Sequence, residues 1–144
     1  MIYLDTSLVV SLYTLDANTA AATAILQSAQ DTRLITSLVE LEVVNALGLR
    51  VFIKEISSLQ AETSLNDFAR DQRAGVYQLR TLPEPSFERA RQLSRNLTAK
   101  LGTRTADLLH VAAAVELGAT GFFSFDLRQR KTAEAVGLQL NPLP

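Results

Sequence analysis

The feature that most constrains the fold of this chain is the alternation of short apolar runs with longer stretches of helical pattern. The short runs predict strands at residues 2–4, 34–36, 76–82, 121–125 and 138–140. The longer stretches predict helices at residues 8–13, 18–29, 37–51, 57–73, 86–101, 105–117 and 127–136. Because such alternation builds a parallel sheet that helices cover on both faces, we predict an α/β fold with a central, mostly parallel sheet of four or five strands.

The size and composition of the chain fit one globular domain over residues 1–144. No repeat or long linker divides it, and the proline-containing stretch at residues 83–85 is the only weak boundary. The sequence contains no cysteine, which excludes a disulfide scaffold, a thiolate zinc site and a cysteine nucleophile. A net charge of −1 excludes binding of nucleic acid by bulk positive charge, so such binding needs local basic groups or a bound cation.

The sequence carries no pattern of a membrane or secreted protein. Its first residues lack the basic region and the small-residue cleavage site of a signal peptide. The most apolar stretch, residues 108–125, is interrupted by His110, Glu116 and two glycines, so it does not resemble a membrane span. We therefore expect a soluble, cytoplasmic protein that has no membrane partner.

Two aspartates directly follow predicted strands. Asp5 follows the first strand, and Asp126 follows the aromatic strand at residues 121–125. Ligands of open parallel sheets bind outside the carboxyl ends of the strands, so both are candidate site residues. Both also precede helices, where Asp is a favoured N-cap, and Asp126 with Gln129 has the spacing of a capping box. The sequence leaves both roles open for each residue.

Glu40 and Glu42 lie on nearly opposite faces of one predicted helix, so they cannot both serve one site. Ser37 and Glu40 have capping-box spacing, which gives Glu40 a structural role. Glu42 interrupts an apolar face that also carries the amide of Asn45. A carboxylate there is costly unless it is paired with an arginine, reaches solvent or binds a metal. We select Glu42 as the site residue of this pair.

Asp107 lies in the first turn of a predicted helix that is apolar almost all round. The helix dipole explains an acid at this position, but the start of a buried helix also points into the interior or a cleft. His110, the only histidine, follows three residues later amid apolar residues. Because no serine elbow of the G-x-S-x-G kind accompanies it, we interpret His110 as a core or supporting residue rather than part of a Ser–His–Asp relay.

The candidate acids indicate a hard cation. Oxygen ligands suit Mg²⁺ or Mn²⁺ rather than Zn²⁺. Converging carboxylates repel one another unless a cation lies between them. A bound cation would also contact phosphate oxygens and activate water, which would let a nearly neutral domain act on a polyanion. The candidate set is Asp5, Glu42, Asp107 and Asp126.

These residues, in this order, resemble the PIN domain. The likeness rests on Asp5-Thr6-Ser7, on residues 37–47 with Glu42, on residues 107–114 and on Ser124-Phe125-Asp126. It is closest to the single-domain VapC toxins of bacterial type II toxin–antitoxin pairs, and it covers essentially the whole chain. The most specific part is the Asp-x-Leu-His-x-Ala-x-Ala pattern of residues 107–114.

The resemblance implies a three-layer α/β/α fold and a Mg²⁺- or Mn²⁺-dependent endoribonuclease. It implies that an acidic quartet holds the metal, matched here by Asp5, Glu42, Asp107 and Asp126. Asp5 and Asp107 would be the main ligands, Thr6 and Ser124 match hydroxyl positions beside the quartet, and we add Asn45 as a supporting residue. The implied reaction is in-line hydrolysis of RNA that leaves 5′-phosphate and 3′-hydroxyl ends. The implied partners are a second copy, in a homodimer, and a small antitoxin that blocks the site.

The chain departs from the family pattern after the fourth acid. Some relatives carry a further acid there, whereas Leu127-Arg128-Gln129-Arg130 follows Asp126 here, which would weaken a second metal site. Arg128 and Arg130 are candidate contacts for substrate phosphates, or else part of a solvated helix face. The apolar helix faces at residues 20–26 and 43–53 are candidate interfaces, although core packing explains them equally well.

Two other functions remain alternatives. A Mg²⁺-binding phosphoryl-transfer or receiver-like domain would also gather aspartates at strand ends. It needs a lysine near the end of a late strand, whereas Lys54, Lys100 and Lys131 fall in predicted helical stretches. A non-catalytic binding module would use the acids only as helix caps, and the burial expected for Glu42 argues against it.

Overall fold

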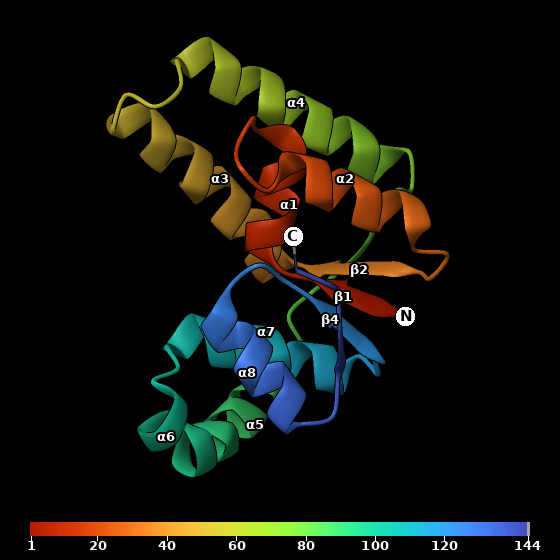
Figure 1. The fold of residues 1–144 in the computed structure, drawn as a ribbon, viewed down its shortest axis with the longest axis vertical. Helices are drawn as coiled ribbons and strands as arrows, with labels where there is room; N and C mark the ends of the chain where they lie inside the picture. The colour runs from red at the N-terminus through yellow and green to blue at the C-terminus, as the bar shows by residue number, and fades with distance from the viewer. Residues whose placement is uncertain (144) are drawn as a thin grey trace.

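Five short strands form the centre of the molecule, as the computed structural model in Figure 1 shows for residues 1–143, the part of the chain that the structure describes. The strands are β1 (Ile2–Leu4), β2 (Arg33–Thr36), β3 (Gln78–Arg80), β4 (Gly121–Phe123) and β5 (Gln139–Leu140). They pair in the order β3-β2-β1-β4-β5, and every neighbouring pair is parallel. The predicted α/β fold with a parallel central sheet is confirmed.

Helices cover both faces of this sheet (Figure 1). Those on one face are α1 (Thr6–Tyr13), α2 (Thr19–Ser28), α3 (Ser37–Phe52) and α4 (Ser58–Arg73). Those on the other face are α5 (Ser86–Leu93), the π-helical turn η1 (Ser94–Thr98), α6 (Ala99–Leu101), α7 (Thr105–Glu116) and α8 (Leu127–Ala135). The helices of each group pack against one another, which gives the three layers α/β/α.

The direction in which strands are added reverses at the centre of the sheet, between β1 and β4. From β1 the chain moves outward through β2 to β3, and it then returns to the other side of β1 to form β4 and β5. Leu4 pairs with Phe123, and the amide of Asp5 donates to the carbonyl of Phe123 at 3.1 Å. In open parallel sheets such a reversal leaves a crevice outside the carboxyl ends of the two strands, and ligands bind there.

The central strands are buried on both faces, as their apolar runs predict. Tyr3, Leu4 and Phe122 are completely buried, and the rings of Tyr3 and Phe122 are stacked with their centroids 5.5 Å apart. The middle of α7, residues 111–114, is completely buried as well. This packed centre fixes the ends of β1 and β4 and hence the residues that follow them.

Two predicted elements differ from the structure. The helix predicted over residues 86–101 is divided by the π-helical turn, and α6 ends at Gly102, whose φ of 65° is a left-handed conformation that glycine adopts without strain. The strand predicted over residues 76–82 pairs only over Gln78–Arg80, because β3 is an edge strand. Tyr77 turns its ring into the core beside Phe68 instead.

The described helices, those within residues 1–143, are all too short or too polar to cross a membrane.

Candidate functional site

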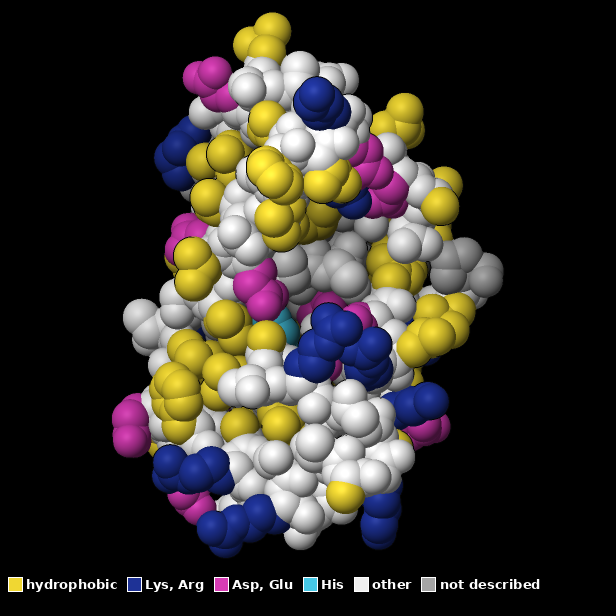
Figure 2. Space-filling model, turned by 90° about the vertical axis from the view of Figure 1, so that its left-hand side faces the viewer, with side chains coloured by type: hydrophobic (Ala, Val, Ile, Leu, Met, Phe, Trp, Pro, Cys, Tyr) yellow, Lys and Arg dark blue, Asp and Glu magenta, His cyan; other side chains and the backbone are white. Residues whose placement is uncertain are grey.

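A pocket of about 440 Å³, which we call the acidic pocket, opens at the carboxyl end of the sheet between α1, α3 and the start of α8. Five of the predicted site residues line it, namely Asp5, Thr6, Glu42, Asn45 and Asp126. Figure 2 views the side of the molecule that lies on the left of Figure 1, and it shows acidic side chains at a hollow near mid-height with Lys and Arg side chains beside them. The fold thus brings together residues that lie far apart in the sequence.

Asp5 is completely buried at the junction of β1 and α1. Its Oδ1 accepts hydrogen bonds from the amide of Leu8 at 3.1 Å and from the hydroxyl of Ser7 at 2.8 Å, so Asp5 is the N-cap of α1. Its Oδ2 is buried without a hydrogen-bond partner. Burial raises the pKa of this carboxyl above its usual value, although His110 and these hydrogen bonds oppose the rise. Asp5 is therefore a helix cap that keeps one oxygen free.

Glu42 lies on α3 and directs its carboxylate towards α1 and α7. Its Oε2 accepts a hydrogen bond from the hydroxyl of Thr6 and lies 2.7 Å from Nε2 of His110. Burial opposes ionisation of Glu42, but its hydrogen bonds with His110 and Thr6 outweigh it and lower the pKa of Glu42 below its usual value. The carboxylate that interrupts the apolar face of α3 is thus paired inside the protein.

Asp126 is the N-cap of α8. Its Oδ1 accepts from the amides of Arg128 at 2.8 Å and Gln129 at 3.0 Å. Ser124 is completely buried, and its hydroxyl accepts from the amide of Asp126 at 2.9 Å and lies 3.4 Å from the hydroxyl of Ser7. Because Ser124 takes that amide, the side chain of Gln129 does not complete the predicted capping box. Asp126 therefore both caps a helix and lines the acidic pocket, as Asp5 does.

Asp107, unlike the other three predicted acids, does not line the acidic pocket. It is buried in the first turn of α7, its Oδ2 accepts from the amide of Arg104 at 2.9 Å, and it lies outside the lining of the acidic pocket. His110 lies one turn later on α7 and reaches Glu42. Because residues three apart share a helix face, Asp107 lies on the side of α7 that faces Glu42. Its place is beside the acidic pocket rather than in it.

The side chains of the site are of the types that bind a hard cation, but they are not arranged around a common point. Within residues 1–143, no group of three or more His, Asp or Glu side chains is arranged so that it could hold a metal ion. The acids that line the acidic pocket are oxygen ligands of the kind that Mg²⁺ and Mn²⁺ prefer, and Oδ2 of Asp5 is buried without a partner. The donor atoms therefore fit a cation, while several of them cap helices or accept hydrogen bonds.

Glu40 does not form the predicted capping box. The N-cap of α3 is Thr36, which makes no side-chain cap bond, and the hydroxyl of Ser37 accepts instead from the amide of Leu82 at 3.0 Å. Glu40 accepts a hydrogen bond from Gln72 on α4 at 3.2 Å. The box prediction was wrong because tertiary neighbours took up both side chains. Glu40 nevertheless faces away from the acidic pocket, towards α4.

The two arginines that follow Asp126 have different surroundings. The guanidinium of Arg130 donates to the carbonyl of Ser124 at 2.9 Å and to Oδ1 and the main-chain oxygen of Asn141 at 2.9 and 2.8 Å. It thereby ties the end of β4 to the C-terminal segment. Arg128 is exposed.

The sequence prediction missed several residues of the acidic pocket. Asp16 and Arg50 form an ion pair at 3.0 Å, and the hydroxyl of Ser11 donates to the same oxygen of Asp16 at 3.1 Å. Arg50 lies about two helical turns after Glu42, so helical spacing alone would have placed it on the same side of α3. The other lining residues outside the prediction include Ser7, Asn18 and Gln129.

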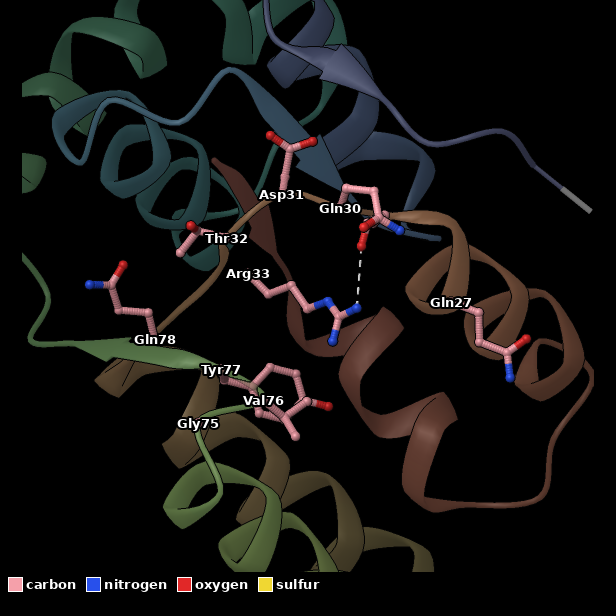
Figure 3. Close-up of a pocket in the computed structure, with 10 residues that line it drawn as sticks. Gln27, Gln30, Asp31, Thr32, Arg33, Gly75, Val76, Tyr77 and Gln78 are labelled. Atoms are coloured by element: carbon pink, nitrogen blue, oxygen red, sulfur yellow. Dashed lines mark hydrogen bonds between the residues drawn. The ribbon is translucent and has the colours of Figure 1, made fainter.

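A larger pocket, of about 570 Å³, lies at the opposite end of the strands from the acidic pocket (Figure 3). Its lining comes from within residues 27–33 and 75–78, at the amino ends of β2 and β3. Arg33 projects into this region and donates to the carbonyls of Leu26 at 2.7 Å and Ala29 at 3.3 Å at the end of α2. Because ligands of parallel sheets gather at the carboxyl ends of strands, we place the candidate site in the smaller acidic pocket.

Comparison with known proteins bears on the family of the chain. The sequence model of the PIN domain matches residues 2–135, whereas no curated protein sequence matches the chain. One similar structure is VapC20 of Mycobacterium tuberculosis, a sarcin-ricin loop cleaving toxin, with 17% identity and a TM-score of 0.74 over 99% of this chain and 100% of that chain. FitAcB of Neisseria gonorrhoeae has 16% identity and a TM-score of 0.72 over 99% and 97% of the two chains. VapBC2 of Rickettsia felis, solved with a DNA fragment from its promoter, has 18% identity and a TM-score of 0.65 over 98% of each chain.

At these identities the structural likeness shows a shared fold. The family match covers the predicted site residues from Asp5 to Arg130. The chain therefore belongs to the PIN domain family.

Proposed function

We propose that this protein is a metal-dependent endoribonuclease, with Mg²⁺ or Mn²⁺ held by Asp5, Glu42, Asp107 and Asp126. The observation that carries the proposal is the carboxylate of Asp5. It is completely buried in a pocket that three other acids also line, namely Asp16, Glu42 and Asp126, and its Oδ2 has no hydrogen-bond partner. A buried, unpartnered carboxylate oxygen is destabilising by itself and is compatible with a cation beside it.

The side chains around the pocket have separate roles in this proposal. A bound divalent cation would neutralise phosphate charge and lower the pKa of an attacking water. Asp5 would offer Oδ2 while its Oδ1 keeps α1 capped, and Glu42 would stay ionised because Thr6 and His110 hydrogen-bond it. Ser124 fixes the main chain of Asp126 through its amide. We assign Asn45 to the support of Glu42, whose side of the pocket it shares.

The substrate would be held mainly through phosphate. Because the net charge is −1, binding of RNA depends on the cation and on local basic groups. Arg128 is exposed at the start of α8, next to Asp126, and is the better placed of the two predicted phosphate contacts. Arg130 would act mainly by holding Ser124 and Asn141 in place.

The decisive experiment is RNA digestion by purified protein with Mn²⁺, with Mg²⁺ and with EDTA, followed by mapping of the cut ends. We expect cleavage with either metal, no cleavage with EDTA, and 5′-phosphate ends. Asp5→Asn is the matched inactive control, because it excludes a contaminating nuclease. Cleavage that persists in EDTA, or in the Asp5→Asn protein, would contradict the proposal.

We further propose that the protein is the toxin of a toxin–antitoxin pair. In support of this, FitAcB and VapBC2 share its fold over nearly the whole chain. Helix α3, the residue after it and the start of α4 also leave large apolar side chains in solvent, with Phe52 82% exposed. The other members of this apolar patch are Leu41, Val44, Leu49, Ile53 and Leu59.

We assign the apolar patch to a small antitoxin, and a homodimer is the second occupant that the family resemblance implies. Val43 and Leu47 of the same helix are buried in the core, so only part of the predicted 43–53 face is available. Co-expression with the product of a short upstream reading frame, where the genome has one, should give a stable and inactive complex that Phe52→Asp disrupts. Light scattering of the protein alone measures whether it is a dimer.

Neither alternative function agrees as well with the site. A receiver-like domain needs a lysine in the pocket, whereas Lys54, Lys100 and Lys131 are exposed and lie outside its lining. A module that uses its acids only as caps would leave Oδ2 of Asp5 without a purpose.

A further inference from the structure

We propose that His110 is a positioning residue that fixes the carboxylate of Glu42, so that only Oε1 of Glu42 is left to act in the acidic pocket. The inference rests on the proposed function only for the role of Glu42. It adds His110, a residue outside the acidic quartet, and it gives the two carboxylate oxygens of Glu42 different roles.

The contacts of His110 tie it to two other elements of the fold, and through Tyr3 to a third. Its imidazole is completely buried, with Nε2 2.7 Å from Oε2 of Glu42 on α3 and Nδ1 2.9 Å from the hydroxyl of Tyr3 on β1. The Tyr3 hydroxyl lies 2.8 Å from Oγ1 of Thr36 at the end of β2. A chain of three hydrogen bonds therefore runs from the core of the sheet to the wall of the acidic pocket.

The direction of each bond follows from which atoms can donate. An ionised carboxylate only accepts, so Nε2 of His110 donates to Glu42. In the neutral ring Nδ1 then carries no proton and accepts from the hydroxyl of Tyr3. Burial raises the pKa of Tyr3, so its hydroxyl keeps the proton that this bond needs. The Tyr3 oxygen can in turn accept from Thr36.

The ring of His110 is also held by packing. Tyr3 meets it edge-on, with the centroids 5.9 Å apart and the planes at 65°, and Tyr3 is itself stacked on Phe122. The imidazole therefore cannot turn without disturbing the central strands. Because Thr6 donates to the same Oε2, both fixed donors act on one oxygen of Glu42. The side chain of Glu42 is 30% exposed and lines the pocket, and because both donors bind Oε2, we infer that Oε1 is the oxygen that faces the pocket.

A histidine that only fills the core would occupy the same volume but would not need a specific proton on Nε2. The two roles predict different consequences of removing the Tyr3 hydroxyl, which lies behind the ring and outside the lining of the pocket. A positioning role predicts that this change reaches Glu42 through the tautomer of His110. A space-filling role predicts a change in stability alone.

The first test is ¹⁵N NMR of the imidazole in tag-free protein without metal. The chain has one histidine, so selective labelling gives a single imidazole whose assignment is certain. We expect the ring to carry its proton on Nε2, in a slowly exchanging hydrogen bond, and we expect Glu42→Gln to shift that proton resonance. A neutral ring protonated on Nδ1, or a resonance that Glu42→Gln leaves unchanged, would overturn the proposal. This result does not depend on whether the protein cleaves RNA.

The second test compares Tyr3→Phe with Tyr77→Phe in Mn²⁺ binding, followed by electron paramagnetic resonance, and in RNA cleavage. Tyr77 is the matched control, since it is also buried and its hydroxyl lies 2.8 Å from that of Tyr13, away from the site. We expect Tyr3→Phe to lower kcat about 10-fold with little change in KM, at the low end of the effect of losing a partner behind a metal ligand. Tyr77→Phe should keep the kcat of the wild type.

His110→Gln and His110→Leu complete the series. The amide of Gln can still donate near the position of Nε2, so we expect it to retain more activity than Leu. If His110→Leu does not fold, Tyr3→Phe still decides the question. Wild-type kcat and Mn²⁺ affinity in both Tyr3→Phe and His110→Gln, with a lowered kcat in Glu42→Gln, would refute the positioning role and leave the proposed nuclease intact. An active Glu42→Gln would instead refute the role of Glu42 itself.

Discussion

The amide of Leu8 donates to Oδ1 of Asp5 at 3.1 Å, so one oxygen of this carboxylate caps α1 while Oδ2 stays buried without a partner. The cap role and the site role, which the sequence presented as alternatives, therefore belong to different atoms of one side chain. Asp126 is similar, because the amides of Arg128 and Gln129 both bind its Oδ1. A helix cap at a strand end holds a carboxylate in a fixed direction, which suits a binding site.

Asp5→Asn should abolish RNA cleavage, by at least about 100-fold, while keeping the fold. Asn is as good an N-cap as Asp, so α1 should remain capped. The change removes a buried carboxylate and should therefore raise the melting temperature of the metal-free protein, by about 2–4 °C per kcal/mol gained. Circular dichroism and the cleavage assay measure the two effects. Full activity of this variant would refute the site assignment.

The pH dependence of stability should differ between the wild type and Asp5→Asn. Burial raises the folded-state pKa of Asp5 above its ordinary value of 3.8. The folded protein therefore binds this proton more tightly than the unfolded chain, and the resulting stability is present at low pH and lost as the pH rises through the folded pKa. Without metal, the melting temperature of Asp5→Asn relative to wild type should increase from about pH 4 upwards and then level off. A difference that is independent of pH would contradict a raised pKa at Asp5.

Metal should stabilise the wild type and not Asp5→Asn. A ligand that binds only the folded state adds about 2.7 kcal/mol at 100 times its dissociation constant. Mn²⁺ titrations followed by differential scanning fluorimetry should therefore raise the melting temperature of the wild type in a concentration-dependent way. Equal shifts in both proteins would indicate that the cation binds elsewhere.

Glu40→Gln and Glu42→Gln should separate the two faces of α3. Glu42 is bonded to Thr6 and His110 in the acidic pocket, whereas Glu40 accepts from Gln72 on α4. We expect Glu42→Gln to lower kcat by about 10- to 100-fold and Glu40→Gln to have near wild-type kinetics. The two substitutions change charge equally, so each is the control for the other. The reverse result would show that the wrong face was chosen.

Arg130→Gln and Arg128→Gln should affect different properties. Arg130 loses bonds to Ser124 and Asn141, which we expect to cost about 1–3 kcal/mol in the free energy of unfolding. Arg128→Gln should leave stability unchanged, raise KM for RNA and reduce the salt dependence of RNA binding. Urea unfolding and binding at several salt concentrations distinguish the two. Equal effects of the two substitutions on RNA binding would indicate that Arg130 also contacts the substrate.

The sequence predicted the elements well where local pattern decides them. The strand at residues 2–4 and the helix that begins at Ser37 agree with the structure because the apolar pattern and helix propensity are local properties of the sequence there. The strand at 76–82 and the helix at 86–101 were only partly right, because an edge strand and a π-helical turn depend on neighbours. The capping box of Ser37 and Glu40 was wrong for the same reason, since Leu82 and Gln72 lie far along the chain.

The sequence by itself determined the order of strands and helices, the parallel sheet and the two aspartates that follow central strands, since these depend on periodicity and local sequence. Only the tertiary structure decided which oxygen of Asp5 is free, that Asp107 lies beside the acidic pocket rather than in it, and that His110 holds Glu42. Those facts depend on contacts such as the one that joins residues 42 and 110, 68 positions apart. Local pattern cannot specify such pairs, because their geometry is set by how whole helices pack across the sheet.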